Sequence, residues 1–253
     1  MSGYSETAVT LSAFPLERAA QALEAALAYL EAEWHYRPAK DPTPARLVFD
    51  PQTGELLQTL NLDERDLKQV IQKYLWVRLD GQIETRSWRH AVELMLHPFR
   101  AHPGQACLSL RMDSKVYESI YEEHRGLEDE DIEDDESYFD EEAMRAVLQL
   151  CMGLARVTEA SGFLLQFFGG VERLRQFDAA ALRELLLNPA QSLHGKQPLL
   201  LVGARNTLVS PAEIEAAWGK GTGNQVMESV SGYVLLNLLD TRGLDTSDED
   251  EDE

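Results

Sequence analysis

Cysteine is scarce in this sequence of 253 residues, which contains only Cys107 and Cys151. The two lie far apart and form neither a CxxC pair nor the Cys/His spacing typical of a zinc site. A disulfide framework and a cysteine-based zinc centre are therefore excluded as organising features of the fold. We expect both thiols to be free and the protein to reside in a reducing compartment.

Long apolar runs are also missing. No stretch approaches the roughly 18 consecutive apolar residues of a membrane-spanning helix. Residues 1–20 lack the basic region followed by an apolar stretch that is typical of a secretory signal. These absences predict a cytoplasmic protein without a membrane partner. The hydrophobic fraction of 44% is nevertheless sufficient for a buried core.

Basic residues are few: the sequence contains 23 Lys and Arg residues and 44 Asp and Glu residues, which gives a formal net charge of −21. Such an excess repels nucleic-acid phosphates and attracts basic proteins. We therefore expect no direct binding of nucleic acid. Arg outnumbers Lys by 17 to 6 and Ala and Leu are abundant, which is typical of a GC-rich bacterial genome.

The acidic residues are concentrated in two runs that contain no Lys or Arg. Eleven fall within residues 126–142 and seven within residues 245–253, so these runs hold eighteen of the 44 acids. Without them, 26 acidic residues face 23 basic ones. The remaining chain is thus close to neutral, like an ordinary folded domain, and the negative charge is local.

Helical and strand patterns follow one another along the rest of the chain. Helical spacing and capping residues predict helices over residues 15–34, 61–74, 87–97, 114–123, 141–160, 179–187 and 211–219. Apolar runs predict strands over residues 107–112, 162–168, 198–204 and 231–240. Turn residues predict hairpins within 47–60 and within 75–86, the second around Asp80-Gly81. We expect an α+β fold, with mixed α/β as the alternative, in which the helices pack on a mixed sheet.

The domain organisation is expected to follow the acidic runs. We predict one α+β domain over residues 1–244 with an acidic insertion at about 126–142, and a disordered acidic tail over residues 245–253. The alternative is a split into residues 1–125 and 143–244. A single domain is favoured because each half has few strands with which to build its own sheet.

The first acidic run is the candidate site for a partner. A solvated loop is one alternative, since blocks of like charge are commonly solvated, and a cation site is another, although no glycine turn of a calcium loop follows Asp129, Asp131 and Glu133. Apolar residues among the acids favour docking, because they can supply buried anchors. The expected partner-binding residues are Glu128, Asp129, Glu130, Asp131, Glu133, Asp134, Asp135, Glu136, Tyr138 and Phe139.

No motif for catalysis or cofactor binding is present. The glycine-rich run at residues 219–223 lacks the strand and helix that flank a phosphate-binding loop, and no GxSxG sequence occurs. His90, Glu93 and His97 would share one face of the predicted helix over residues 87–97, but HxxExxxH is not the HExxH zinc motif. We expect no catalytic residue, no metal and no cofactor.

These observations favour an acidic binding protein that neutralises a basic protein. The most concrete form is a bacterial immunity protein or antitoxin that inhibits a nuclease toxin by occluding its positive cleft. One alternative is an enzyme with a scattered, metal-assisted site around His90, Glu93 and His97. Another is a chaperone-like acidic carrier of many basic proteins.

Overall fold

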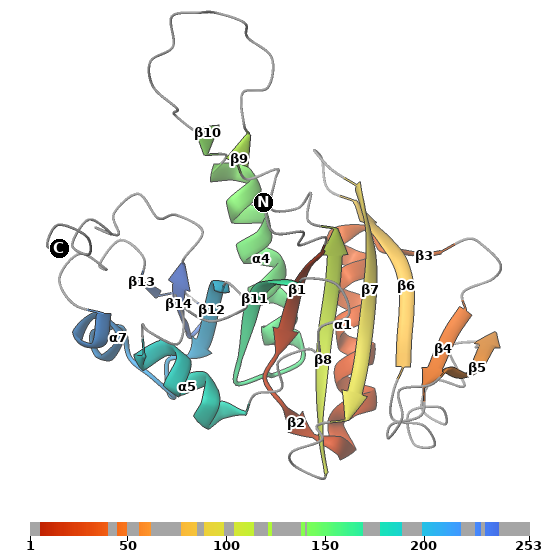
Figure 1. Cartoon of the computed structure of the whole chain (residues 1–253), viewed down its shortest axis with the longest axis horizontal. Helices are drawn as coiled ribbons and strands as arrows, with labels where there is room; N and C mark the ends of the chain where they lie inside the picture. The colour runs from red at the N-terminus through yellow and green to blue at the C-terminus, as the bar shows by residue number, and fades with distance from the viewer. Residues whose placement is uncertain are drawn as a thin grey trace, which may run out of the picture.

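The computed structural model describes residues 6–39, 45–49, 56–61, 77–84, 89–98, 104–113, 121–122, 138–139, 141–168, 178–188, 199–218, 226–228 and 231–237. Within these ranges, four α helices accompany a large antiparallel sheet (Figure 1), which confirms the α+β class. Every described strand pairing is antiparallel, whereas we expected a mixed sheet.

The sheet has β1 near its middle. Its strands are β1 (Glu6–Leu11), β2 (Phe14–Pro15), β3 (Arg37–Pro38), β4 (Ala45–Phe49), β5 (Leu56–Asn61), β6 (Val77–Glu84), β7 (Arg89–Pro98), β8 (Gln105–Asp113), β11 (Gly162–Phe168), β12 (Leu199–Arg205), β13 (Val226–Glu228) and β14 (Tyr233–Asn237). Their order is β13-β14-β12-β11-β1-β8-β7-β6-β4-β5, with β2 on β8 and β3 on β6. Strand β1 pairs with β8 on one side and β11 on the other, so segments from both sides of the acidic insertion share one sheet.

The four helices begin and end close to the predicted positions. They are α1 (Ala19–Trp34), preceded by a 3-10 turn (Leu16–Arg18), α4 (Glu141–Val157), α5 (Ala179–Leu187) and α7 (Pro211–Trp218). Asp178 caps α5 by accepting a hydrogen bond from the Ala181 amide at 2.9 Å. Ser210 and Glu213 form a reciprocal capping box at the start of α7. None of the helices in the described ranges has the length and apolarity required to cross a bilayer.

The helices form layers on both faces of the sheet. Helices α1 and α4 contact each other and cover the face that carries Val9, Leu94, Leu110 and Phe163. Helices α5 and α7 cover the opposite face at the β11-β12-β14 end, around Leu164, Val202 and Leu236. Each face of this end of the sheet thus has its own apolar core.

The predicted hairpin around Asp80-Gly81 is wrong, since residues 77–84 form one continuous strand. Gly81 lies inside β6 where Tyr36 and β3 approach, and the Tyr36 hydroxyl donates to the Asp80 carbonyl at 3.3 Å. A Cβ atom at Gly81 would overlap the Tyr36 ring and lie 2.7 Å from the Arg37 carbonyl oxygen. The glycine therefore permits a close approach and does not mark a turn.

The predicted helix over residues 87–97 is also wrong, because Arg89–Pro98 is strand β7. The apolar residues Val92, Leu94, Met95 and Leu96 fit both helical and strand spacing, so periodicity alone did not decide between them. Pairing with β6 on one side and β8 on the other satisfies the backbone of β7 as a strand. The hairpin predicted within residues 47–60 is confirmed by β4 and β5.

Several predicted segments fall wholly or largely outside the described residues. These are the helices over 61–74 and 114–123 and the tail over 245–253. Where the second helix was expected to end, Tyr121–Glu122 forms β9 instead.

Candidate functional site

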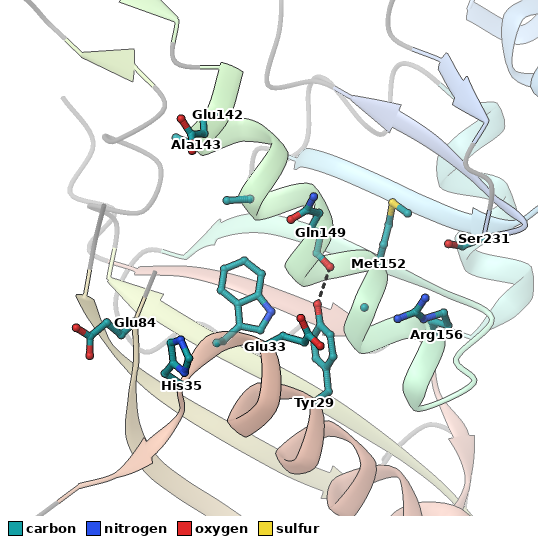
Figure 2. Close-up of a pocket in the computed structure, with 13 residues that line it drawn as sticks. Tyr29, Glu33, His35, Glu84, Glu142, Ala143, Gln149, Met152, Arg156 and Ser231 are labelled. Atoms are coloured by element: carbon teal, nitrogen blue, oxygen red, sulfur yellow. Dashed lines mark hydrogen bonds between the residues drawn. The ribbon is translucent and has the colours of Figure 1, made fainter. Parts of the chain in front are cut away.

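A cavity of about 1090 Å³ opens between α1 and α4 (Figure 2). Its lining comes from the last two turns of α1, one side of α4, the end of β6 and Ser231 before β14. The arrangement depends on how α1 ends. His35 adopts a left-handed conformation (φ 49°), and the Tyr36 amide donates back to the Leu30 carbonyl at 3.0 Å. This cap places Glu33, Trp34 and His35 together at the cavity.

Tyr29 joins the two helices beneath this cavity. Its hydroxyl donates to the Gln149 carbonyl of α4 at 2.9 Å, as Figure 2 shows. Burial raises the pKa of Tyr29, and a side-chain hydrogen bond with Trp34 opposes that increase. Tyr29 therefore stays protonated at neutral pH and serves as a structural link and an aromatic wall.

The cavity is acidic at one end. Glu33, Glu84 and Glu142 line it, and Arg89 binds Glu84 at 2.9 Å and lowers the pKa of that carboxyl. Arg156 lies on the last turn of α4 and Glu142 on the first, which separates them by about 21 Å at roughly 1.5 Å per helical residue. Figure 2 accordingly shows Arg156 beside Ser231 at the end away from Glu84 and Glu142.

The predicted acidic docking segment is connected to the body next to α4. Strand β9 pairs with β10 (Tyr138–Phe139), with Glu122 opposite Tyr138 and Tyr121 opposite Phe139. The two ends of segment 123–137 are therefore adjacent, and α4 begins at Glu141, directly after β10. Of the predicted partner-binding residues, Tyr138 and Phe139 form β10. The eight acids from Glu128 to Glu136 lie outside the described residues.

The proposed face of His90, Glu93 and His97 does not exist, because side chains alternate along a strand. His90 is buried on the face of Val92 and Leu94, whereas Glu93 lies on the opposite face. In register, His97 stands opposite Cys107. Among the described residues, no group of three or more His, Cys, Asp and Glu side chains is arranged to hold a metal.

Glu93 instead belongs to an ion-pair network at a second cavity, of about 470 Å³. Arg78 binds Asp80 at 2.8 Å and also binds Glu93, and Arg111 lies 3.8 Å from Glu93. Two acids thus balance two bases. The network was missed because its members lie on three strands and meet only through register, in which Glu93 stands opposite both Asp80 and Arg111.

The two cysteines are free and buried. Burial raises the pKa of Cys107 to about 12 and raises the pKa of Cys151 as well. The Cys107 thiol donates to the Leu11 carbonyl at 3.0 Å. Both therefore contribute to packing and are not reactive thiolates.

Comparison with protein families, with curated proteins and with solved structures finds no match to this chain. The candidate sites therefore stand on their own geometry.

Proposed function

We propose that this chain is an acidic binding protein that neutralises a basic protein partner in the bacterial cytoplasm. Its most concrete form is an immunity protein or antitoxin that occludes the positive cleft of a nuclease toxin. The observation that carries the proposal is the placement of eighteen of 44 acids in two runs without a single Lys or Arg. A nuclease cleft that binds phosphates attracts carboxylates in the same way.

The described structure supports this proposal through the attachment of the acidic segment. Pairing of β9 with β10 holds the ends of segment 123–137 together, next to the first turn of α4. Glu142 on that turn, with Glu33 and Glu84, extends the negative charge into the cavity between α1 and α4. A charged segment speeds association, and a shaped surface beside it adds specificity.

The proposal is tested by affinity capture from native cell lysate, at low and moderate salt, followed by mass spectrometry. The bait is the full-length protein, beside a variant in which the eight acids from Glu128 to Glu136 become Gln or Asn. A variant with the seven tail acids neutralised is a control of nearly matched charge. We expect one stoichiometric basic partner that resists moderate salt and is lost only with the first variant.

A dedicated inhibitor must also suppress its partner. The captured protein is expressed alone and together with the full-length chain, and nuclease activity and cell survival are measured. Loss of activity on co-expression supports the proposal. Many basic proteins that leave together on adding salt, or equal loss with the tail variant, would show a nonspecific acidic surface or carrier instead.

A further inference from the structure

A smaller cavity, of about 280 Å³, adjoins the acidic one and has the opposite charge. It shares Arg156 and Ser231 with the larger cavity, and Arg205, Asn206 and Thr207 complete its polar lining. These residues come from the last turn of α4, the end of β12 with the turn that follows it, and the turn before β14. Two guanidinium groups therefore line one small cavity in a chain whose net charge is −21.

The two arginines differ from others in the described part of the chain. Five described arginines form ion pairs with carboxylates: Arg18, Arg78, Arg89, Arg111 and Arg183. Within the same ranges, Arg156 and Arg205 form none. Burial raises the pKa of Tyr233 in this cavity and the charge of Glu159 adds to that increase, but the Glu159 carboxylate is bound by Arg18.

Arg205 is held in place by the surrounding structure. Its Nε donates to the Ala160 carbonyl at 3.2 Å, and the Tyr233 hydroxyl donates to the same carbonyl at 2.9 Å. Arg205 and Tyr233 also share a side-chain hydrogen bond. A guanidinium has five N–H donors, so donors remain after these contacts. A fixed fork with unused donors loses little conformational entropy when it binds an anion.

The backbone joins the two turns of the cavity. The Asn206 amide donates to the Gly232 carbonyl at 2.9 Å, and the Leu208 amide donates to the Arg205 carbonyl at 2.8 Å. These bonds fix the positions from which the Thr207 and Ser231 hydroxyls line the cavity. Guanidinium forks with nearby hydroxyl donors are a donor set that suits the paired oxygens of a carboxylate or phosphate.

We propose that the cavity between Arg156, Arg205 and Ser231 binds a single oxyanion, a carboxylate or phosphate group. Its volume lies just below the roughly 300–1,000 Å³ range of sites for drug-sized ligands, so it fits a group and not a large molecule. The anion is either a small free ion or a carboxylate carried on a protein. The inference is independent of the proposed basic partner, because it uses none of the acids of the first run.

The test is a titration of the full-length protein at constant ionic strength, followed by the NMR signals of the arginine Nε–H groups. The probes are inorganic phosphate and a blocked tripeptide containing one glutamate. We expect saturable shifts of the Arg156 and Arg205 signals. Arg156→Gln and Arg205→Gln should each weaken binding by at least about tenfold, as expected for a lost charge-assisted hydrogen bond.

Arg78→Gln is the matched control, since Arg78 pairs with Asp80 and Glu93 on the β6–β7 side of the sheet, does not line this cavity and should not affect either titration. Arg156 is exposed, so its variant keeps the test valid if loss of Arg205 unfolds the protein. Saturation by phosphate alone identifies a free ion, and saturation by the peptide alone identifies a protein-borne carboxylate. Linear shifts of all arginines with both probes, or binding unchanged in both variants, overturn the proposal.

Discussion

The two ends of the sheet bury their strands differently. At one end, β14 is buried at all five positions, because the core beneath α4 covers one face and α5 and α7 cover the other. Toward the other end, β6 alternates: Val77, Leu79, Gly81 and Ile83 are buried, whereas Arg78, Asp80, Gln82 and Glu84 are at least partly exposed. The opposite face there carries the ion pairs of Arg78 and Glu93. One sheet thus combines a three-layer region with a region whose second face is charged.

The residue patterns of the strands reflect this difference in burial. The sequence YVLLN of β14 is apolar on both faces, as expected of a strand between two layers. The sequence VRLDGQIE of β6 alternates, as expected of a strand with one apolar face. The pattern of a strand therefore indicates how many of its faces meet a helix.

The largest expected effect is a loss of stability when either face of β14 is truncated, which tests whether both faces contribute to the free energy of unfolding. Leu235 is 2% exposed and faces the α1–α4 layer, and Leu236 is fully buried on the opposite face. We expect Leu235→Ala and Leu236→Ala each to lower the free energy of unfolding by about 2–5 kcal/mol. Urea denaturation followed by circular dichroism measures both.

The matched pair on β6 should behave unequally. Leu79 is 6% exposed, and Leu79→Ala should lower the free energy of unfolding by about as much as the two β14 variants do. Gln82 is exposed, and Gln82→Ala should change the free energy of unfolding by no more than about 0.5 kcal/mol. If Leu236→Ala were as mild as Gln82→Ala, the second core would not stabilise the fold and the comparison between the two ends would fail.

A smaller effect is expected from Gly81→Ala in β6. The added methyl group would meet the Tyr36 ring and the Arg37 carbonyl oxygen, which belongs to the backbone and cannot rotate away. Overpacking of this kind costs about 1–3 kcal/mol. In a double-mutant cycle with Tyr36→Ala, part of the loss should be recovered. Strictly additive losses would show that the close approach does not constrain residue 81.

The smallest effect concerns pH and the layer formed by α5 and α7. The hydrogen bond from Arg183 and those from Ser210 lower the pKa of Glu213 from 4.5 to about 2. A carboxyl whose pKa is lowered on folding stabilises the folded state above its unfolded pKa and loses that effect as pH falls through its folded pKa.

The stability difference between the unmodified protein and Glu213→Gln should therefore be full above pH 4.5 and disappear toward about pH 2. Thermal unfolding at a series of pH values measures it. Glu215→Gln on the same helix is the control and should leave the pH dependence in place. A constant difference for Glu213→Gln across this range would contradict the assigned ion pair.

The helices were predictable because their signals are local. Apolar spacing over residues 15–34 and 141–160, the cap at Asp178 and the Ser210-Pro211 start all depend on neighbours within one or two turns. The strands of the three-layer region were equally accessible, since each is a short apolar run.

The remaining features depend on contacts between distant segments. The Asp80-Gly81 sequence alone predicts a turn. The real reason for the glycine is the Tyr36 ring, which is far away in sequence and packs against it. The members of the ion-pair network lie on three strands, and Arg156 and Arg205 lie on α4 and β12, so no spacing along the chain reveals either group. Of the candidate sites, only the local charge of the first acidic run was visible beforehand, and its eight acids from Glu128 to Glu136 lie outside the described residues.

The pairing of β9 with β10 has a further consequence for how this molecule could change over evolutionary time. Since β9 pairs with β10, the residues on either side of segment 123–137 are adjacent, and an insertion or deletion between them can leave this pairing in place. For a flexible loop in general, each doubling of its length adds only about 0.6 kcal/mol to the entropic cost of closing it. A change in the length or charge of this segment is therefore compatible with the same sheet and the same helices.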